Sequence, residues 1–211
     1  MEPGKRLAPL FHRPARARAL AWGRAPLAFA PSRALRRLIA AAEVDGWLDC
    51  SLLHHPFFSM VRGGKPLLLS QVSSSRTVAG QTAPGCIDGK KVRRWMERGA
   101  TLMVGNLHEW HAPSQRFCRT LAGGSSWKVG AAVFWTAAGS RGLRPHFDDA
   151  HVFVAQIAGA KRWSLYDRRR GVESVVELRP GDGLYVPEGF VHGTEALAEA
   201  SLHVSVTFRP A

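Results

Sequence analysis

The segment LRPHFDD, residues 143–149, places a histidine and a carboxylate two positions apart. Side chains alternate across a strand with a period of two, so His146 and Asp148 are expected to share one face. A surface strand has no need of that pair, whereas a divalent metal ion does. Asp149 follows directly and is expected to point away from the pair, either as a hydrogen-bonding partner of the ligands or as a solvated side chain.

A third ligand is available in RPGDGLYVPEGFVHG, residues 179–193. Gly181 begins a predicted tight turn before a short apolar strand, and Gly189 lies in a second bend. These bends would present His192 beside the preceding strand. Two histidines and one carboxylate leave coordination positions open, which suits non-haem Fe(II) binding a cosubstrate and dioxygen together. Each motif alone is common, but the two together in β-patterned segments predict a metal site.

From residue 127 onward, short apolar runs are separated by glycine, proline and charged turns, such as HVFVAQIAG and GLYVPEG. This spacing is typical of an all-β sandwich or barrel. We therefore predict a mostly β fold with N-terminal helices. Residues 127–211 would form a double-stranded β-helix, or jelly roll, as the catalytic core. Residues 1–126 would form a helical and irregular half that packs on this core within one domain.

The N-terminal half contains helix and turn signals. A helix is predicted for residues 32–47, with Ser32 as N-cap and Gly46 at its end. Two further helices are predicted at 87–99, between Asp88 and Gly99, and at 112–124, between Ser114 and Gly123. A strand is predicted at 100–107, a turn and strand at 63–72, and a loop at 73–85.

Composition excludes several classes of protein. The chain has 211 residues, 45% of them hydrophobic, which is enough for one domain with a core. The chain has no apolar run of about 18 residues, so we expect no membrane span. We expect no secretory signal either. The cysteines, Cys50, Cys86 and Cys118, are few and widely spaced, which favours a reducing, cytoplasmic location.

The formal charge of +13 is concentrated early, because residues 1–40 carry nine Lys or Arg and one acid, Glu2. One interpretation is affinity for nucleic acid, ribosomes or acidic peptides. The other is solvated charge from arginine-rich coding. A mitochondrial targeting segment is disfavoured by Pro14, Pro26 and Pro31, which interrupt a helix.

Two segments carry a family resemblance: GSRGLRPHFDDAHVFVAQIAGAKRWSLYD, residues 139–167, and LRPGDGLYVPEGFVHGTEALAEASLHVSVTF, residues 178–208. Both resemble the JmjC/cupin oxygenases of the ribosomal-oxygenase type, in a short bacterial form. AWGRAPLAF, residues 21–29, and RGATLMVGNLHEW, residues 98–110, are similar less sharply. The resemblance implies a JmjC-like jelly roll and an Fe(II)- and 2-oxoglutarate-dependent dioxygenase that hydroxylates a protein or peptide side chain.

The same resemblance assigns site residues. His146, Asp148 and His192 match the catalytic iron ligands, and Thr207 matches a small hydroxyl near the cosubstrate. Lys161 matches the residue that holds the far carboxylate of 2-oxoglutarate. Physical chemistry supports Lys161 independently, because a buried carboxylate needs a cationic partner. The alternative is a solvated lysine at a strand end.

The sequence also departs from the family. Ala132 stands where relatives often have an asparagine, so one polar contact near the cosubstrate is missing. Helical dimerisation and winged-helix regions of larger relatives have no counterpart, so a homodimer and a ribosomal substrate stay open. Rival hypotheses are the same chemistry on a small molecule or a tRNA base, and a non-enzymatic metal-binding cupin. Lys161 argues against the last of these.

Other side chains have less specific interpretations. His203 is expected inside the barrel, as a core residue or a ligand, and Arg162 should face away from Lys161. His108 and His111 flank Trp110 in a predicted loop, where a second metal site is not expected. Residues 168–170, three arginines, form a predicted hairpin tip, either solvated or binding an anionic substrate.

Overall fold

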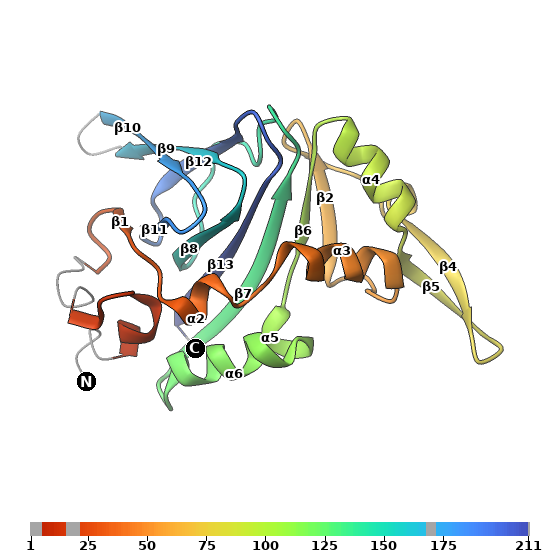
Figure 1. Ribbon diagram of the computed structural model, residues 1–211, viewed down its shortest axis with the longest axis horizontal. Helices are drawn as coiled ribbons and strands as arrows, with labels where there is room; N and C mark the ends of the chain where they lie inside the picture. Colours follow the sequence, from red (N-terminus) through yellow and green to blue (C-terminus); the bar gives the residue numbers. More distant parts are fainter. Residues whose placement is uncertain (1–5, 16–21, 168–171, 211) are drawn as a thin grey trace.

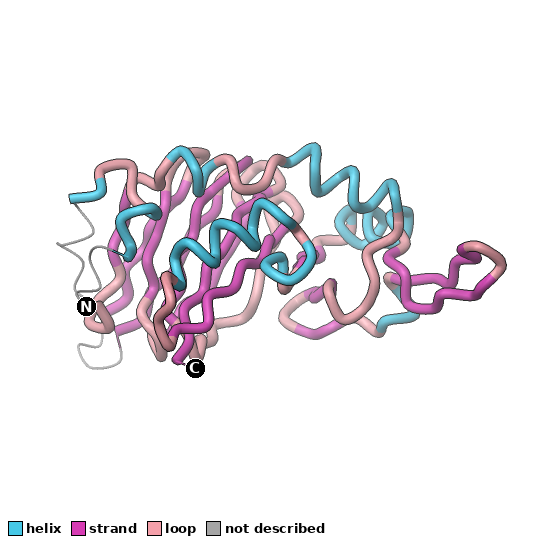
Figure 2. The backbone as a smooth tube through the Cα atoms, turned by 90° about the horizontal axis from the view of Figure 1, so that it is seen from below, coloured by secondary structure: helices cyan, strands magenta, loops and turns pink. Residues whose placement is uncertain are grey.

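Two facing antiparallel sheets form the centre of the molecule (Figure 1). The structure is a computed structural model that describes residues 6–15, 22–167 and 172–210. The large sheet has eight strands in the order β1-β11-β8-β13-β7-β6-β2-β3, and the small sheet has three in the order β10-β9-β12. A two-stranded hairpin, β4-β5, projects from the body (Figure 2).

The C-terminal strands build a double-stranded β-helix. A cluster of buried residues that includes Val154, Trp163 and Leu184 packs the two sheets together. The mostly β, jelly-roll prediction is thereby confirmed. The strands are β7 (Trp127–Thr136), β8 (His151–Ala158), β9 (Lys161–Asp167), β10 (Val172–Leu178), β11 (Gly183–Val186), β12 (Val191–Ala196) and β13 (Ser201–Pro210).

Residues before 127 extend the large sheet at both edges. β1 pairs with β11, and β6 pairs with β7, each antiparallel. β2 then pairs with β6 and with β3. The main hydrophobic core contains residues from both halves of the chain, among them Leu48, Leu102 and Val204. These strands are β1 (Leu27–Phe29), β2 (Phe58–Arg62), β3 (Lys65–Pro66) and β6 (Ala100–Val104).

Helices cover the face of the large sheet that points away from the small sheet (Figures 1 and 2). Their apolar sides, including Leu35, Val44 and Leu121, join the main core. They are η1 (Ala8–Leu10), α2 (Arg33–Arg36), α3 (Ala41–Cys50), α5 (Leu107–Trp110) and α6 (Ala112–Ala122). Among the described residues, no helix is long and apolar enough to cross a membrane.

The single helix predicted for residues 32–47 is two helices. Ser32 caps α2 as predicted, because its Oγ accepts a hydrogen bond from Leu35 N at 3.1 Å. The predicted end at Gly46 is wrong: α3 continues to Cys50 and ends at Ser51, whose φ is 51°. A glycine inside a helix costs about 1 kcal/mol. Burial of Leu48, which is 1% exposed, outweighs that cost.

The loop predicted at 73–85 is wrong. These residues form β4 (Ser73–Val78) and β5 (Gln81–Ile87). The turn between them places Ala79 and Gly80 at φ 49° and 77°, the signature of a two-residue hairpin turn. The small polar side chains are mostly exposed, so no alternation of apolar residues marks the strands. The strand predicted at 63–72 is reduced to β3, followed by a 3-10 helix at Leu69–Gln71.

The two remaining helices match their predictions closely. α4 (Gly89–Glu97) is capped by Asp88, whose Oδ1 accepts from Lys91 N at 3.0 Å. α6 ends at Gly123 as predicted, with φ 50°. Its predicted cap is wrong, because His111 occupies that position and Ser114 lies inside the helix. His111 Nδ1 accepts a hydrogen bond from Ser114 N at 3.4 Å and so takes the place of an ordinary hydroxyl cap, while the same nitrogen lies 2.7 Å from Ser114 Oγ.

Candidate metal centre

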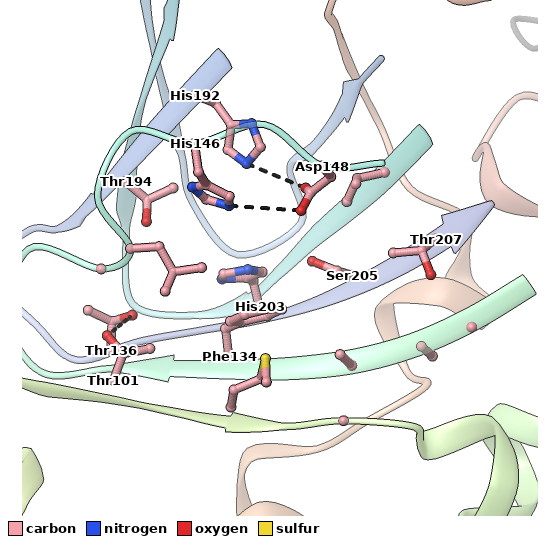
Figure 3. Close-up of a pocket in the computed structure, with 18 of the residues that line it drawn as sticks. Thr101, Phe134, Thr136, His146, Asp148, His192, Thr194, His203, Ser205 and Thr207 are labelled. Carbon is pink, nitrogen blue, oxygen red and sulfur yellow. Dashed lines mark hydrogen bonds and ion pairs between the residues drawn. The ribbon is translucent and has the colours of Figure 1, made fainter. Parts of the chain in front are cut away.

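His146, Asp148 and His192 come together at one end of the jelly roll. Each offers a ligand atom, and these atoms all lie within 4.8 Å of one another. The Nε2 atom of His146 is 3.9 Å from Asp148 Oδ1, and that of His192 is 3.7 Å from Asp148 Oδ2 (Figure 3). Among the described residues this is the one group of at least three potential ligands that meets such a distance limit.

Backbone pairing fixes this approach. His146 lies before β8 rather than within a strand, but it forms an isolated bridge with His192, which is in β12. Their backbones exchange two hydrogen bonds, N to O, of 2.9 and 2.8 Å. A residue pair bonded in this way holds its side chains next to each other. The bridge therefore holds the His146 side chain in a fixed position, as the expected strand would have done.

Two backbone carbonyls orient the imidazoles. Nδ1 of His146 lies 2.8 Å from Arg144 O, and Nδ1 of His192 lies 3.0 Å from Phe190 O. A carbonyl only accepts, so each Nδ1 must carry the proton and donate. Each Nε2 is then left with its lone pair on the side of Asp148. This is how metal-binding histidines are normally held.

The donor set fits a divalent ion. Burial lowers the pKa of His192, and the hydrogen bond to the Phe190 carbonyl opposes this effect. Burial therefore favours the neutral imidazole that a metal requires. Two neutral imidazoles and one carboxylate, with space on one side, match the two-histidine, one-carboxylate set of non-haem Fe(II) sites.

A cavity of about 350 Å³ opens from the cluster between the two sheets. Figure 3 shows Thr101 and Thr136 on one side of it, and Ser205 and Thr207 on the other. Among the described residues lining it, Asp148 is the sole acid. We call the two sides the Thr136 end and the Thr207 end.

Lys161 lies at the Thr136 end and is only 1% exposed. Its Nζ donates to Thr136 Oγ1 at 2.8 Å and lies 3.3 Å from His203 Nδ1. Thr101 Oγ1 in turn donates to Thr136 Oγ1 at 3.1 Å. Burial lowers the pKa of Lys161 to about 7. The lysine is therefore not a solvated strand end but a buried amine beside a cavity, and a carboxylate ligand there would stabilise its charged form.

Thr207 lines the same cavity at the other end. Its Oγ1 accepts a weak hydrogen bond from Arg209 Nη1 at 3.4 Å, whereas the contacts of Lys161 are with Thr136 and His203. The hydroxyl beside the lysine belongs to Thr136, which sequence reasoning missed. The available signal was weak: Thr136 is the polar last residue of a strand that is otherwise mostly apolar. Ala132 also lines the cavity, at the position where the family resemblance led us to expect an asparagine.

Other residues with predicted roles lie near the metal cluster but do not belong to it. Asp149 points away, with a side chain 79% exposed and paired with Arg209 Nε at 2.9 Å. Arg162 faces outward, as expected, and pairs with Glu177 at 2.9 Å. His203 lies inside the barrel, in the cavity. The three arginines at 168–170 lie outside the described residues.

The histidines around Trp110 form no second metal cluster among the described residues. His108 lines the Thr207 end of the cavity. His111 is buried, and its Nε2 lies 3.0 Å from Glu43 Oε1. His108 is therefore part of the cavity wall, and His111 is the cap of helix α6.

Comparison with known proteins assigns the fold to a family. A family model described as a JmjC domain matches residues 107–176 and 170–211. Ribosomal oxygenase 2 of Rattus norvegicus is 40% identical over 97 residues, covering 37% of this chain and 21% of the relative. The chain contains a JmjC domain. This JmjC protein is also 30% identical over 131 residues to the bifunctional lysine-specific demethylase and histidyl-hydroxylase NO66 of Dictyostelium discoideum, covering 53% of this chain and 26% of the relative.

Solved structures show the same fold. The ribosomal oxygenase YcfD from Escherichia coli superposes with a TM-score of 0.59 at 20% identity, covering 93% of this JmjC protein and 51% of YcfD. Another YcfD structure, with a TM-score of 0.59, 21% identity and coverage of 94% and 51%, holds cobalt and 2-oxoglutarate. The chain thus spans about half of YcfD and about a quarter of the curated relatives it matches.

Proposed function

We propose that this JmjC protein is an Fe(II)- and 2-oxoglutarate-dependent dioxygenase that hydroxylates a C–H bond of a protein or peptide side chain. The observation that carries this proposal is the shared cavity: a two-histidine, one-carboxylate cluster and the buried Lys161 line the same space. The family match and the names of its relatives favour an oxygenase that acts on protein.

Three residues would hold the iron. His146 and His192 would bind through Nε2, since each Nδ1 is engaged with a backbone carbonyl. Asp148 would bind through a carboxylate oxygen. A bound Fe(II) would supply dioxygen activation: one oxygen atom would go to 2-oxoglutarate, which loses carbon dioxide and becomes succinate, and the other would convert the substrate C–H to C–OH. The protein fixes the ligands on one side and leaves the cavity side open.

Lys161 would bind the far carboxylate of 2-oxoglutarate. A carboxylate in this cavity loses its hydration and needs a charged hydrogen-bond donor. Lys161 retains a donor, because Thr136 and His203 engage two of its three hydrogens. The Thr136 hydroxyl holds the ammonium group at a fixed position.

The substrate would enter from the Thr207 end. Small side chains, including Ala132 and Ser205, line this part of the cavity and leave room for a substrate group. Thr207 and His108 offer polar atoms there.

We propose a cytoplasmic location for the protein. Affinity for nucleic acid and formation of a homodimer stay predictions.

Turnover of 2-oxoglutarate tests the proposal directly. Purified protein with Fe(II), ascorbate and 2-oxoglutarate is expected to release succinate, and the Asp148→Ala variant is expected to release none. Binding of Mn(II), followed by its electron paramagnetic resonance signal, should weaken about a hundredfold or more in that variant. Wild-type protein that binds Mn(II) but neither binds nor consumes 2-oxoglutarate would point to a metal-binding cupin without oxygenase activity.

The substrate class needs a separate experiment. Peptide libraries, tRNA and a mixture of small molecules are each incubated with the active protein, and a mass increase of one oxygen is sought in each. Oxidation of peptides supports the proposal. Oxidation of tRNA alone, or of small molecules alone, would replace the protein substrate by the corresponding alternative.

A further inference from the structure

His203 is buried inside the cavity although it is not one of the three clustered ligands. It belongs to β13 and is 3% exposed. Its ring stacks on Phe134, with ring centroids 5.0 Å apart and an interplanar angle of 7°. It also meets Trp163 edge-on at 5.5 Å. Figure 3 shows the ring on the floor of the pocket, facing the metal cluster.

A strand irregularity lies at this residue. Leu202 pairs with Ala158, but His203 pairs with Gln156, so Ile157 of β8 has no partner across the ladder. An extra residue of this kind is a β-bulge, and bulges near active sites often re-aim a side chain. The register shift therefore marks His203 as a residue whose direction is specifically set.

The ring has one occupied and one free nitrogen. Nδ1 lies 3.3 Å from Lys161 Nζ, and Nε2 has no hydrogen-bond partner among the described residues. A protonated lysine has three donors and no acceptor, so Nδ1 must accept when Lys161 is charged. The ring proton then resides on Nε2 and gives the cavity a second donor.

The His203 ring also stays neutral when Lys161 is charged. Burial and the neighbouring charge of Lys161 lower the pKa of His203 well below its ordinary value. A neutral imidazole can accept at one nitrogen and donate at the other, whereas a charged one could only donate. Neutrality also avoids placing two positive charges 3.3 Å apart.

We propose that His203 is a positioning residue for the dicarboxylate: Nδ1 holds the Lys161 ammonium in place, and Nε2–H donates to an oxygen of the anion bound between Lys161 and the metal cluster. The identity of the anion as 2-oxoglutarate rests on the proposed function. The contact between His203 and Lys161 does not.

Two substitutions separate the roles of the ring. His203→Phe keeps the ring volume and the stack on Phe134 but removes both nitrogens. His203→Asn restores a polar group close to the position of Nδ1. Affinity for 2-oxoglutarate is measured by calorimetry on Mn(II)-loaded protein, with Mn(II) affinity and melting temperature recorded for each variant.

His203→Phe is expected to weaken 2-oxoglutarate binding about ten- to one-hundredfold, because hydrogen bonds to charged groups are lost. Mn(II) affinity should change less than about twofold, since the three ligands are untouched. His203→Asn should recover part of the loss. Equal 2-oxoglutarate affinity in wild type and His203→Phe would overturn the proposal, as would equal weakening of 2-oxoglutarate and Mn(II) binding.

A second measurement needs no cosubstrate. The titration of Lys161 is followed by NMR of labelled lysine in the metal-free protein. Removing an acceptor destabilises the charged amine, so His203→Phe should lower the pKa of Lys161 further, and His203→Asn should restore it. An unchanged titration would overturn the role of Nδ1. Failure of the wild type to bind 2-oxoglutarate would overturn the proposed function and the role of Nε2, while this titration would still decide the role of Nδ1.

Discussion

At the scale of single residues, the charges in the cavity are complementary to a metal ion and a dicarboxylate. The cluster of His146, Asp148 and His192 carries one negative charge when its imidazoles are neutral, and Lys161 adds one positive charge. A divalent ion and a doubly charged 2-oxoglutarate then bring the formal total to zero. A low-dielectric cavity favours such neutrality, because uncompensated charge is costly there.

Removing the Lys161 charge should abolish cosubstrate binding without harming the fold. In Lys161→Met a buried ammonium is replaced by an apolar side chain of similar length. We expect 2-oxoglutarate affinity to fall about a hundredfold or more, with an unchanged or raised melting temperature. Calorimetry and thermal unfolding measure both quantities.

Arg162→Met is the matched control, because that neighbour points outward and is 43% exposed. It should bind 2-oxoglutarate like the wild type. Equal effects of the two substitutions would contradict the assignment of the cosubstrate carboxylate to Lys161.

Binding of 2-oxoglutarate should depend on pH through the same lysine. Burial lowers the pKa of Lys161 to about 7, and a bound carboxylate would raise it again. Below that pH the amine is already charged. Above it, binding must take up a proton, so affinity should fall by up to about tenfold per pH unit. Calorimetry in buffers of different ionisation enthalpy would detect the uptake. Constant affinity between about pH 6 and pH 9, without proton uptake, would be incompatible with this account.

At the scale of elements, tight turns bring the site residues into register. The β8–β9 turn contains Gly159, whose φ is 59°, and Lys161 follows two residues later at the start of β9. The segment before β8 is tied at several points. Gly142 N donates to Thr194 O at 2.8 Å, and Arg144 Nε donates to Gly63 O at 3.1 Å. The loop that carries His146 is therefore attached to both the small sheet and the N-terminal half.

Gly159→Ala should destabilise the turn that places Lys161. A Cβ atom there would lie 2.1 Å from Ala200 O, in addition to the strain of a positive φ. We expect the free energy of unfolding to fall by about 2–4 kcal/mol, as measured by chemical denaturation.

Gly139→Ala provides the comparison for that turn. Its φ is 60°, but a Cβ atom would meet nothing within 4 Å. The strain alone should cost about 1–2 kcal/mol. If the two substitutions cost the same, the close backbone approach at Gly159 is not a constraint on the turn.

At the scale of the whole molecule, the jelly roll and the N-terminal half share one sheet and one core. β7 pairs with β13 on one side and with β6 on the other, and β11 pairs with β1. The N-terminal helices supply much of the main core. The three residues of the metal cluster all lie within residues 127–211. The strands and helices that extend and cover the large sheet lie before residue 127.

Residues 127–211 should therefore not fold alone. Without the preceding strands, the β7 and β11 edges and an apolar sheet face are exposed, which favours aggregation over a packed state. We expect the fragment to show no cooperative thermal transition, whereas the full chain should show one. A well-dispersed NMR spectrum and cooperative unfolding of the fragment would prove this expectation wrong.

The sequence by itself determined the metal ligands as candidates, the β character of the second half, and Lys161 as a candidate cation. The ligand candidates and the β character depend on residue type and local spacing, which strand alternation and turn chemistry express directly, whereas Lys161 was named by its resemblance to a family. Local signals also located Ser32, Asp88 and Gly123 at helix ends. They failed at residues 73–85, where small polar side chains give an exposed hairpin no apolar pattern to detect.

Only the tertiary structure decided which distant groups meet. The bridge between His146 and His192, the hydroxyl of Thr136 beside Lys161, and the direction of His203 all depend on strand register. A shift of one residue in register moves a side chain to the opposite face, and no local pattern encodes the bulge opposite His203. Contacts across the sheets are set by the packing of the whole core, so they could be read only from the folded chain.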